Sequence, residues 1–214
     1  MKSSETKQKL LTIGLDQVSV RGLSGVTLGQ LASASGLSKS GLFAHFKSKE
    51  QLQIELLEEM ARTADRTVVV PAMREATGLP RLKALVDLWF GWPHRAGLEG
   101  GCPAAAALFE LDDIDTVVRE HVCKLEAQWR LLLLQIVRDA VAEKHLSAET
   151  DVEQFVWELG GIYLAHHASS RFLRDNEADT RARQAFDALL ARNRATHGSD
   201  SVQLKIGSKR DVHD

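Results

Sequence analysis

Apolar residues recur through most of the chain at spacings of three and four, which is the period of an amphipathic helix. One stripe runs over residues 4–20, a short helical hairpin follows at residues 27–47, and a longer stripe covers residues 49–76. No segment shows a convincing alternation of apolar and polar residues, the pattern of a half-buried strand. The sequence therefore predicts an all-α fold.

Prolines and glycines divide the longer stripes into separate helices. Pro71 should kink or break the helix over residues 49–76, because proline lacks the backbone N–H and clashes with the preceding turn. Gly78 and Pro80 indicate a helix end followed by a new start, and Pro93 is expected to end a helix over residues 79–92. Further helices are predicted over residues 103–111, within residues 112–145, and over residues 151–172 and 178–194. The helix within residues 112–145 is apolar all round at positions 131–134, so we expect it to be central.

Residues 27–49 combine the features of a helix-turn-helix. Thr27 is a good N-cap, and the glutamine three residues later completes a capping box. Gly36 lies where the turn between the two helices needs a positive φ. Ser38 is the next N-cap, and Leu42 and Phe46 lie four residues apart on the inner face of the second helix.

The outer face of the second helix is small and polar, so it can enter a major groove without clashing. Lysines beside it suit contacts with phosphates. The candidate contacts to double-stranded DNA are Thr27, Ser38, Lys39, Ser40, Gly41, Phe43, Ala44, His45, Lys47 and Lys49. The alternative is an ordinary helical hairpin with solvated lysines, but the caps, the glycine turn, the apolar inner face and the basic rim together favour DNA binding.

The order of these residues resembles the TetR family of transcriptional regulators. The resemblance runs from about residue 6 to residue 56. It rests on Gly22, Val26-Thr27, Leu31-Ala32, Ser35-Gly36-Leu37-Ser38-Lys39 and Gly41-Leu42-Phe43-Ala44-His45-Phe46-Lys47-Ser48-Lys49-Glu50. Phe43 stands where the family usually carries tyrosine, so a hydroxyl that would contact phosphate is missing. The resemblance implies a helix-turn-helix domain at residues 1–50, an effector-binding and dimerisation bundle at residues 51–196, and, we expect, a flexible tail at residues 197–214.

Charge and composition agree with this division. Residues 1–49 hold seven Lys and Arg against two Asp and Glu, whereas the whole chain has a formal net charge of −2. A basic head on an acidic body favours DNA contact at one end only. No run reaches the roughly 18 apolar residues of a membrane span, and the N-terminus has no apolar signal region. We therefore expect a cytoplasmic protein without a membrane segment.

Aromatic residues are dense in the middle helices, where large side chains between Gly and Ala can frame an apolar cavity. The family resemblance implies that such a cavity binds a small-molecule effector. For any single aromatic residue the alternative is plain core. We name Trp89, Phe109 and Trp129 as candidate lining residues and His166 as a candidate polar contact.

The chain shows no spacing typical of an enzyme or a metal site. It has no glycine-rich phosphate loop and no nucleophile elbow. His166 and His167 are adjacent, and adjacent helix positions point about 100° apart, so the two rings do not suit one ion. The two cysteines form no CxxC pair, which argues against structural zinc and a disulfide framework. We expect neither catalysis nor a metal or other cofactor.

Cys102 supports an alternative function. It precedes Pro103 at a helix start, where free N–H groups stabilise a thiolate, so the protein could be a redox or electrophile sensor with DNA binding as its output. A cysteine that is simply a small buried apolar residue is commoner. A hairpin that binds a protein partner, or a small enzyme, is a weaker alternative.

The resemblance also implies a homodimer. The helix from Val152 and the last helix of each subunit would form a four-helix interface on a two-fold axis. The candidate interface residues are Phe155, Leu159, Gly160, Ile162, Tyr163, Phe186 and Leu189. The alternative is that these residues pack within one subunit. We call the helix-turn-helix domain of each subunit, residues 1–50, the reader. We hypothesise a repressor whose dimer holds its two readers at the spacing of a palindromic operator. An effector would release the dimer from DNA by favouring a conformation in which the two readers have a different spacing.

Overall fold

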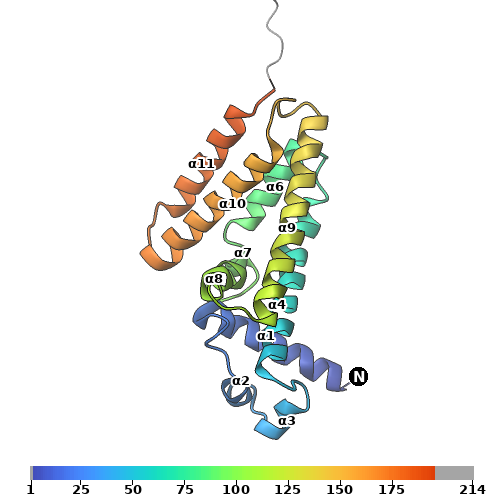
Figure 1. Ribbon diagram of the computed structural model, residues 1–214, viewed down its shortest axis with the longest axis vertical. Coiled ribbons are helices and arrows are strands. Elements are labelled where there is room, and N and C mark those ends of the chain that lie inside the picture. The colour runs from blue at the N-terminus through green and yellow to red at the C-terminus, as the bar shows by residue number, and fades with distance from the viewer. Residues whose placement is uncertain (1, 196–214) are drawn as a thin grey trace, which may run out of the picture.

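The computed structural model describes residues 2–195, and over that range the chain forms helices and no strand (Figure 1). At one end lie α1 (Lys2–Arg21), α2 (Leu28–Ser35) and α3 (Lys39–Phe43). The body contains α4 (Lys49–Ala64), η1 (Asp65–Val69), α5 (Val70–Ala72), α6 (Leu79–Trp89), α7 (Trp92–Arg95), α8 (Pro103–Glu110), α9 (Val117–Ala142), α10 (Val152–Ala168), η2 (Ser169–Leu173) and α11 (Ala178–Arg192). The all-α prediction is confirmed. The tail predicted at residues 197–214 lies outside the described residues.

The three N-terminal helices and the start of α4 share one apolar core. Leu31, Leu42, Phe46 and Leu52 are fully buried there. This core continues into the body, because Val122 of α9 and residues of α8 belong to the same cluster. α4 packs against both α1 and α9, so it extends from the N-terminal unit into the body.

Two prolines act differently from the sequence prediction. The helix over residues 49–76 does not break before Pro71: helical backbone continues from α4 through the π-helical turn into the short α5, which contains Pro71. Pro93 does not end a helix but lies in the first turn of α7, where its missing N–H costs nothing. The helix before it ends at Trp89, and Gly91 makes the turn with a φ of +74°.

The body packs around α9, which contacts α4, α6, α8 and α10. α10 and α11 lie side by side along one flank (Figure 1). The predicted central place of α9 therefore fits its contacts. Its four consecutive apolar residues at positions 131–134, however, are not all buried. Leu133 is buried, whereas Leu131 lies on the outside with 63% of its surface exposed.

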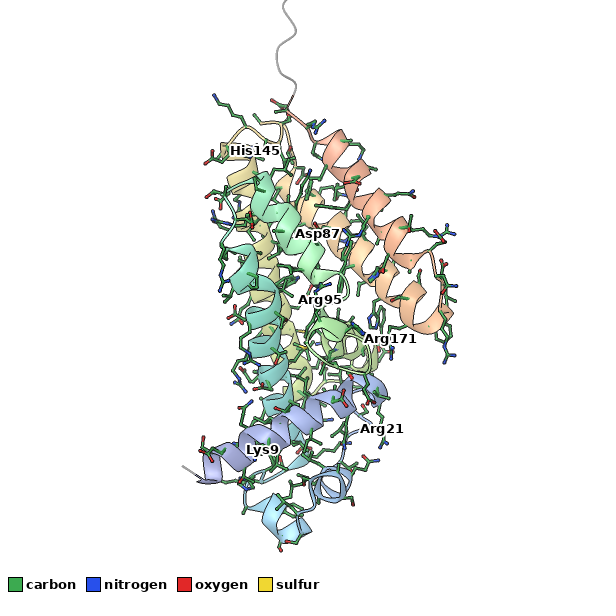
Figure 2. All side chains as sticks on the ribbon, turned by 180° about the vertical axis from the view of Figure 1, so that it is seen from behind. Lys9, Arg21, Asp87, Arg95, His145 and Arg171 are labelled. Atoms are coloured by element: carbon green, nitrogen blue, oxygen red, sulfur yellow. The ribbon has the colours of Figure 1, made fainter. Side chains whose placement is uncertain are left out.

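Polar contacts fix α6 within the body. Leu79 donates its N–H to Nδ1 of His145 at 3.2 Å, which caps the start of the helix. At the other end, the guanidinium of Arg95 donates to the carbonyls of Asp87 and Phe90 (Figure 2). Asp87 also pairs with Arg183 of α11. Within residues 2–195 no helix is both long and apolar enough to cross a bilayer.

Candidate DNA-reading surface and effector cavity

The turn between α2 and α3 has the local chemistry that the sequence indicates. Thr27 Oγ1 accepts from the N–H of Gln30 at 3.2 Å, and the Thr27 N–H donates to Gln30 Oε1 at 3.1 Å, which completes a capping box. Gly36 ends α2 with a φ of +70°. Ser38 Oγ accepts from the N–H of Gly41 at 3.1 Å and starts α3. These contacts define where α2 begins and ends and where α3 begins.

The outer face of α3 is open, as a DNA-reading surface requires. Ser40, Phe43, Ala44 and Lys47 are exposed, while Leu42 between them is fully buried. Thr27 and Ser38 are exposed at the two helix starts, Gly41 and His45 are half-buried, and Lys39 begins α3. Lys49 is exposed, and its Nζ donates to the carbonyl of Ser24 at 3.3 Å. The predicted DNA residues from Ser38 to Lys47 therefore lie on or directly beside α3 at the tip of the molecule, while Thr27 caps α2 and Lys49 begins α4 (Figure 1).

The body forms a cavity of about 640 Å³, partly open to the surface, between α4, η1, α6, α8, α9 and α10. Trp89, Trp129 and Tyr163 form an aromatic wall. The Trp89 and Tyr163 rings stack with centroids 4.2 Å apart, and Trp129 meets Trp89 edge-on at 4.9 Å. Trp92 Nε1 donates to the Tyr163 hydroxyl at 3.1 Å. Burial, together with the neighbouring Cys102, raises the pKa of Tyr163 well above its ordinary value, so this wall is neutral.

Residues 10–56 match the family described as bacterial regulatory proteins, tetR family, and residues 78–186 match the family described as Tetracyclin repressor-like, C-terminal domain. The chain belongs to the TetR family. It is therefore a transcriptional regulator with a DNA-binding helix-turn-helix, which confirms the resemblance read from the hairpin.

Known relatives agree with this assignment. The chain is 36% identical over 56 residues to the HTH-type transcriptional regulator AcrR of Shigella flexneri, a match that spans about a quarter of the length of AcrR, 26% of each chain. A TetR transcriptional regulator from Chloroflexus aurantiacus J-10-fl is 24% identical, with a TM-score of 0.77 over 89% of this chain and 94% of that one. A TetR-family regulator from Cytophaga hutchinsonii is 19% identical, with a TM-score of 0.79 over 91% and 97%. The two solved structures show the shared fold.

Two of the four predicted effector contacts line the cavity of this TetR-family protein, and two do not. Trp89 and Trp129 are in its wall. Phe109 is 63% exposed on the outside of α8, because its neighbour Leu108 takes the inward position about 100° away. His166 is buried, but its Nε2 lies 2.6 Å from Asp179 Oδ1, so it joins α10 to α11 instead.

Most of the predicted dimer residues are buried within one subunit. Phe155, Leu159, Phe186 and Leu189 pack between α10, α11 and the rest of the body, and Tyr163 belongs to the cavity wall. Gly160 lines the cavity, and Ile162 is partly buried against the core. The correction follows from helix geometry, because the large apolar residues of α10 and α11 face each other. The apolar side chains left outside on this flank are Trp157, Phe172 and Leu173.

A link between body and reader was not predicted. The carboxylate of Glu110, at the end of α8, accepts from the N–H groups of Leu23 at 3.1 Å and Ser24 at 2.9 Å, directly after α1. In the loop before α8, Gly100 and Gly101 donate their N–H groups to Ser19 Oγ and Ser19 O, each at 2.9 Å. In the sequence only the paired glycines could have signalled this close approach of two backbones.

This loop lies between the reader and the flank of the body. A Cβ on Gly101 would lie 2.7 Å from the His167 ring and 3.1 Å from Arg171 Nε. Figure 2 shows Arg21, at the end of α1, and Arg171, in η2, on the same edge of the molecule. The loop from Gly97 to Cys102 therefore contacts α1 on one side and the α10–η2 segment on the other.

The two cysteines differ in burial. Cys102 is the N-cap residue of α8 and lies in the cavity wall, with only 5% of its surface exposed. Cys123 on α9 is exposed, and both are free cysteines. Over the part of the chain that the structure describes, no group of three or more His, Cys, Asp and Glu side chains could hold a metal ion.

A buried carboxylate lies on α4, on the side that faces α1. Glu59 is almost fully enclosed and pairs with Arg62 at 3.0 Å and Arg66 at 3.3 Å. Burial acts to raise the pKa of Glu59, but hydrogen bonds from Gln8 and from the two guanidinium groups outweigh it, so the pKa lies below its ordinary value. The group is therefore held as a carboxylate.

Proposed function

We propose that this TetR-family protein is a ligand-responsive repressor, which binds a palindromic operator as a homodimer and leaves it when a small molecule fills the cavity. One observation carries the proposal. Cys102, Ala105 and Leu108 of the α8 segment line the cavity, while Glu110 at the end of the same helix holds the turn after α1. A molecule in the cavity therefore touches the helix that positions the reader.

The DNA contacts proposed for the reader are those around α3. Ser40 and Ala44 on the exposed face suit contacts with base edges, and Lys47 and Lys49 suit contacts with phosphates. A solved structural neighbour, AibR, is described in complex with isovaleryl coenzyme A and operator DNA; it is 17% identical, with a TM-score of 0.65 over 89% of this chain and 98% of that one. That neighbour shows that a protein of this fold can bind both a small molecule and operator DNA, which supports the two binding sites proposed here.

The proposed dimer uses the outer flank of α10 and η2. Trp157, Phe172 and Leu173 are large apolar side chains exposed on this flank, and Phe172 is 86% exposed. Contiguous exposed apolar patches mark interaction surfaces, and we assign these three side chains to one such patch. A two-fold contact here would cover the flank and place two readers on one face of the DNA.

The switch needs a difference in affinity between two states. An effector that binds better when α8 has moved would shift the population toward that state, by no more than its differential affinity. The displacement would reach α1 through the contacts of Glu110 and of the Gly100–Gly101 loop. This scheme assigns no chemical reaction to the chain.

The first test is selection of bound sequences from randomised duplex DNA by the full-length protein. We expect a consensus with two-fold symmetry and a complex that contains two chains by light scattering. A matched pair of variants separates reading from assembly: Ser40→Ala should change the preferred bases, whereas Phe172→Glu should reduce dimerisation and operator affinity together. Retention of DNA without any consensus would contradict the proposal.

A thiol sensor is the second candidate, because Cys102 lies in the wall of the same cavity. An electrophile that enters the cavity would then react with its sulfur. Release of DNA by peroxide or a soft electrophile, lost in Cys102→Ser but kept in Cys123→Ser, would favour this function. An equal response of both variants would exclude it.

A further inference from the structure

We infer that Phe43 selects a thymine in each half of the operator, because its ring lies against the 5-methyl group of that base in the major groove. The inference deepens the proposed function and rests on it only in taking the reader to bind a specific operator. It gives a specificity-determining role to a side chain that has no polar atom.

Phe43 lies in the middle of the exposed face formed by α3 and the turn after it. The exposed residues of this face follow the helical spacing of three and four: Ser40, Phe43, Ala44 and Lys47. The Phe46 N–H donates to Leu42 O at 3.0 Å, which continues the helical backbone past Phe43. Leu42 and Phe46 themselves are fully buried on the opposite face. Figure 1 shows α3 at the outer end of the molecule, so the body does not cover the exposed face.

The centre of this face is apolar. Phe43 has 53% of its surface exposed, and the next residue, Ala44, is exposed as well. The polar groups lie toward the ends of the face, where the Ser40 hydroxyl is 3.0 Å from Ser38 Oγ and Lys47 carries a charge. A phenyl ring has no conventional hydrogen-bond donor or acceptor, so it cannot read a base edge by polar contact. An exposed ring gains free energy where it leaves water for another apolar surface.

The major groove of DNA offers one apolar group. Each base pair presents its own pattern of donors and acceptors there, and thymine adds the 5-methyl group. A phosphate is charged and hydrated, so a ring placed against it would remove water without replacing its hydrogen bonds. Contact with a methyl group instead buries apolar surface on both partners. The thymine methyl group is therefore the part of the groove that suits Phe43 best.

The area of a methyl group sets the size of the effect. Burial of one group of this size corresponds to about fourfold in affinity. A homodimer on a two-fold operator makes the contact twice, at sites far enough apart to act independently. Loss of both methyl groups should therefore weaken binding by roughly fifteenfold.

Deoxyuridine isolates the contribution of the methyl group, because it differs from thymidine by that group alone. Once the operator has been selected from random duplex DNA, each thymine of the half-site is replaced in turn, at both symmetric positions. Binding of the full-length protein is measured by fluorescence anisotropy at one fixed salt concentration. We expect a position at which the replacement weakens binding by roughly fifteenfold.

Variants of Phe43 assign this effect to its ring. Phe43→Ala should bind the thymine and deoxyuridine operators about equally at that position. Phe43→Tyr keeps the ring and should keep the preference for thymine. Val20→Ala is the matched control, because Val20 has the same exposed fraction, 53%, but lies on α1 and not on this face. It should keep the full preference, and thermal unfolding reports that each variant is folded.

Three results would overturn the inference: no thymine whose replacement weakens binding, a preference that survives in Phe43→Ala, or its loss in Val20→Ala as well. A preference that survives in Phe43→Ala would assign the methyl contact to another residue of the face, with Ala44 the first to test. The proposed function fails separately. If the thymine preference behaves as expected but the bound protein represses no transcription from a reporter that carries the operator, Phe43 reads the base and the protein is not a repressor. A two-fold consensus without any effect of the methyl groups would leave operator binding in place and remove only the role of Phe43.

Discussion

Replacing Gly100 by alanine should loosen the contact between α1 and the loop before α8. An ideal Cβ on Gly100 would lie 1.8 Å from the carbonyl oxygen of Ser19 and 2.0 Å from its carbon, which are backbone atoms that cannot rotate away. The loop must therefore move by more than 1 Å. That movement breaks the hydrogen bonds from Gly100 and Gly101 to Ser19, and also the bond from the Glu99 N–H to Asp16 Oδ1, now 2.8 Å.

The size of the effect follows from these three bonds. Each contributes about 0.5–1.5 kcal/mol net, so their joint loss lowers the free energy of unfolding by roughly 2–4 kcal/mol. For a chain of this length each kcal/mol corresponds to about 2–4 °C in Tm, which gives a decrease of roughly 5–15 °C. The α1 amides near residue 19 should also exchange faster, because the end of α1 then lacks its contacts with this loop.

Differential scanning calorimetry and amide hydrogen exchange measure both effects. The matched control is Gly161→Ala, since a Cβ there meets nothing within 4 Å and the helix gains from alanine. Its Tm should stay the same or rise by a few degrees. A Gly100→Ala protein that unfolds at the wild-type temperature, with unchanged exchange in α1, would refute the role given to this loop.

Three further changes test other parts of the structure. In Glu110→Gln an NH₂ group replaces one of the two oxygens that accept from the amides of Leu23 and Ser24, so one of these amides loses its acceptor. The free energy of unfolding should fall by about 1–3 kcal/mol, and the two amides should exchange faster. Unchanged protection of these amides would contradict the role given to Glu110 in joining α8 to the turn after α1. Lys47→Ala should weaken binding to all DNA sequences and reduce the salt slope by about 1, whereas Lys83→Ala on the exposed side of α6 should leave the slope unchanged. Because the folded pKa of Glu59 is lowered from 4.5, its carboxylate stabilises the fold above that pH and loses this effect as the pH falls through the folded value. Glu59→Gln should therefore be less stable at pH 7, with a flatter acid limb in a series of chemical unfolding curves; an identical acid limb would show that the ion pairs contribute nothing.

The reader could be predicted almost in full from its sequence, because its chemistry is local. The residues that start each helix are adjacent in the chain to the amides they cap, as Thr27 and Ser38 show. Gly36 needs its positive φ for the same local reason. The burial of Leu42 and Phe46 follows from their spacing. None of these features depends on where the rest of the molecule lies.

The body could be predicted only as a set of helices. Which face of a helix meets the cavity depends on its neighbours, so the sequence prediction named Phe109 where Leu108 lines the cavity. Tyr163 is an aromatic residue of the kind that is common at protein interfaces, and it was predicted there, but it lies in the cavity wall. Pro93 signals an interruption equally well at the end of one helix or the start of the next. These outcomes are set by contacts between residues far apart in the chain.

Two helices of the body, α4 and α8, hold α1 and the turn after it, and both do so by directional polar contacts as well as by packing. From α4, Gln53 Nε2 donates to the carbonyl of Leu23 at 3.0 Å, and Glu55 pairs with Lys7 at 2.7 Å. From the α8 segment, Gly100 donates to Ser19 Oγ and Glu110 accepts from the amide of Leu23. Hydrogen bonds are directional, so a shift of one helix relative to the other must strain the turn after α1. The cavity lies between these two helices, so a molecule that moves them apart acts on the orientation of the reader.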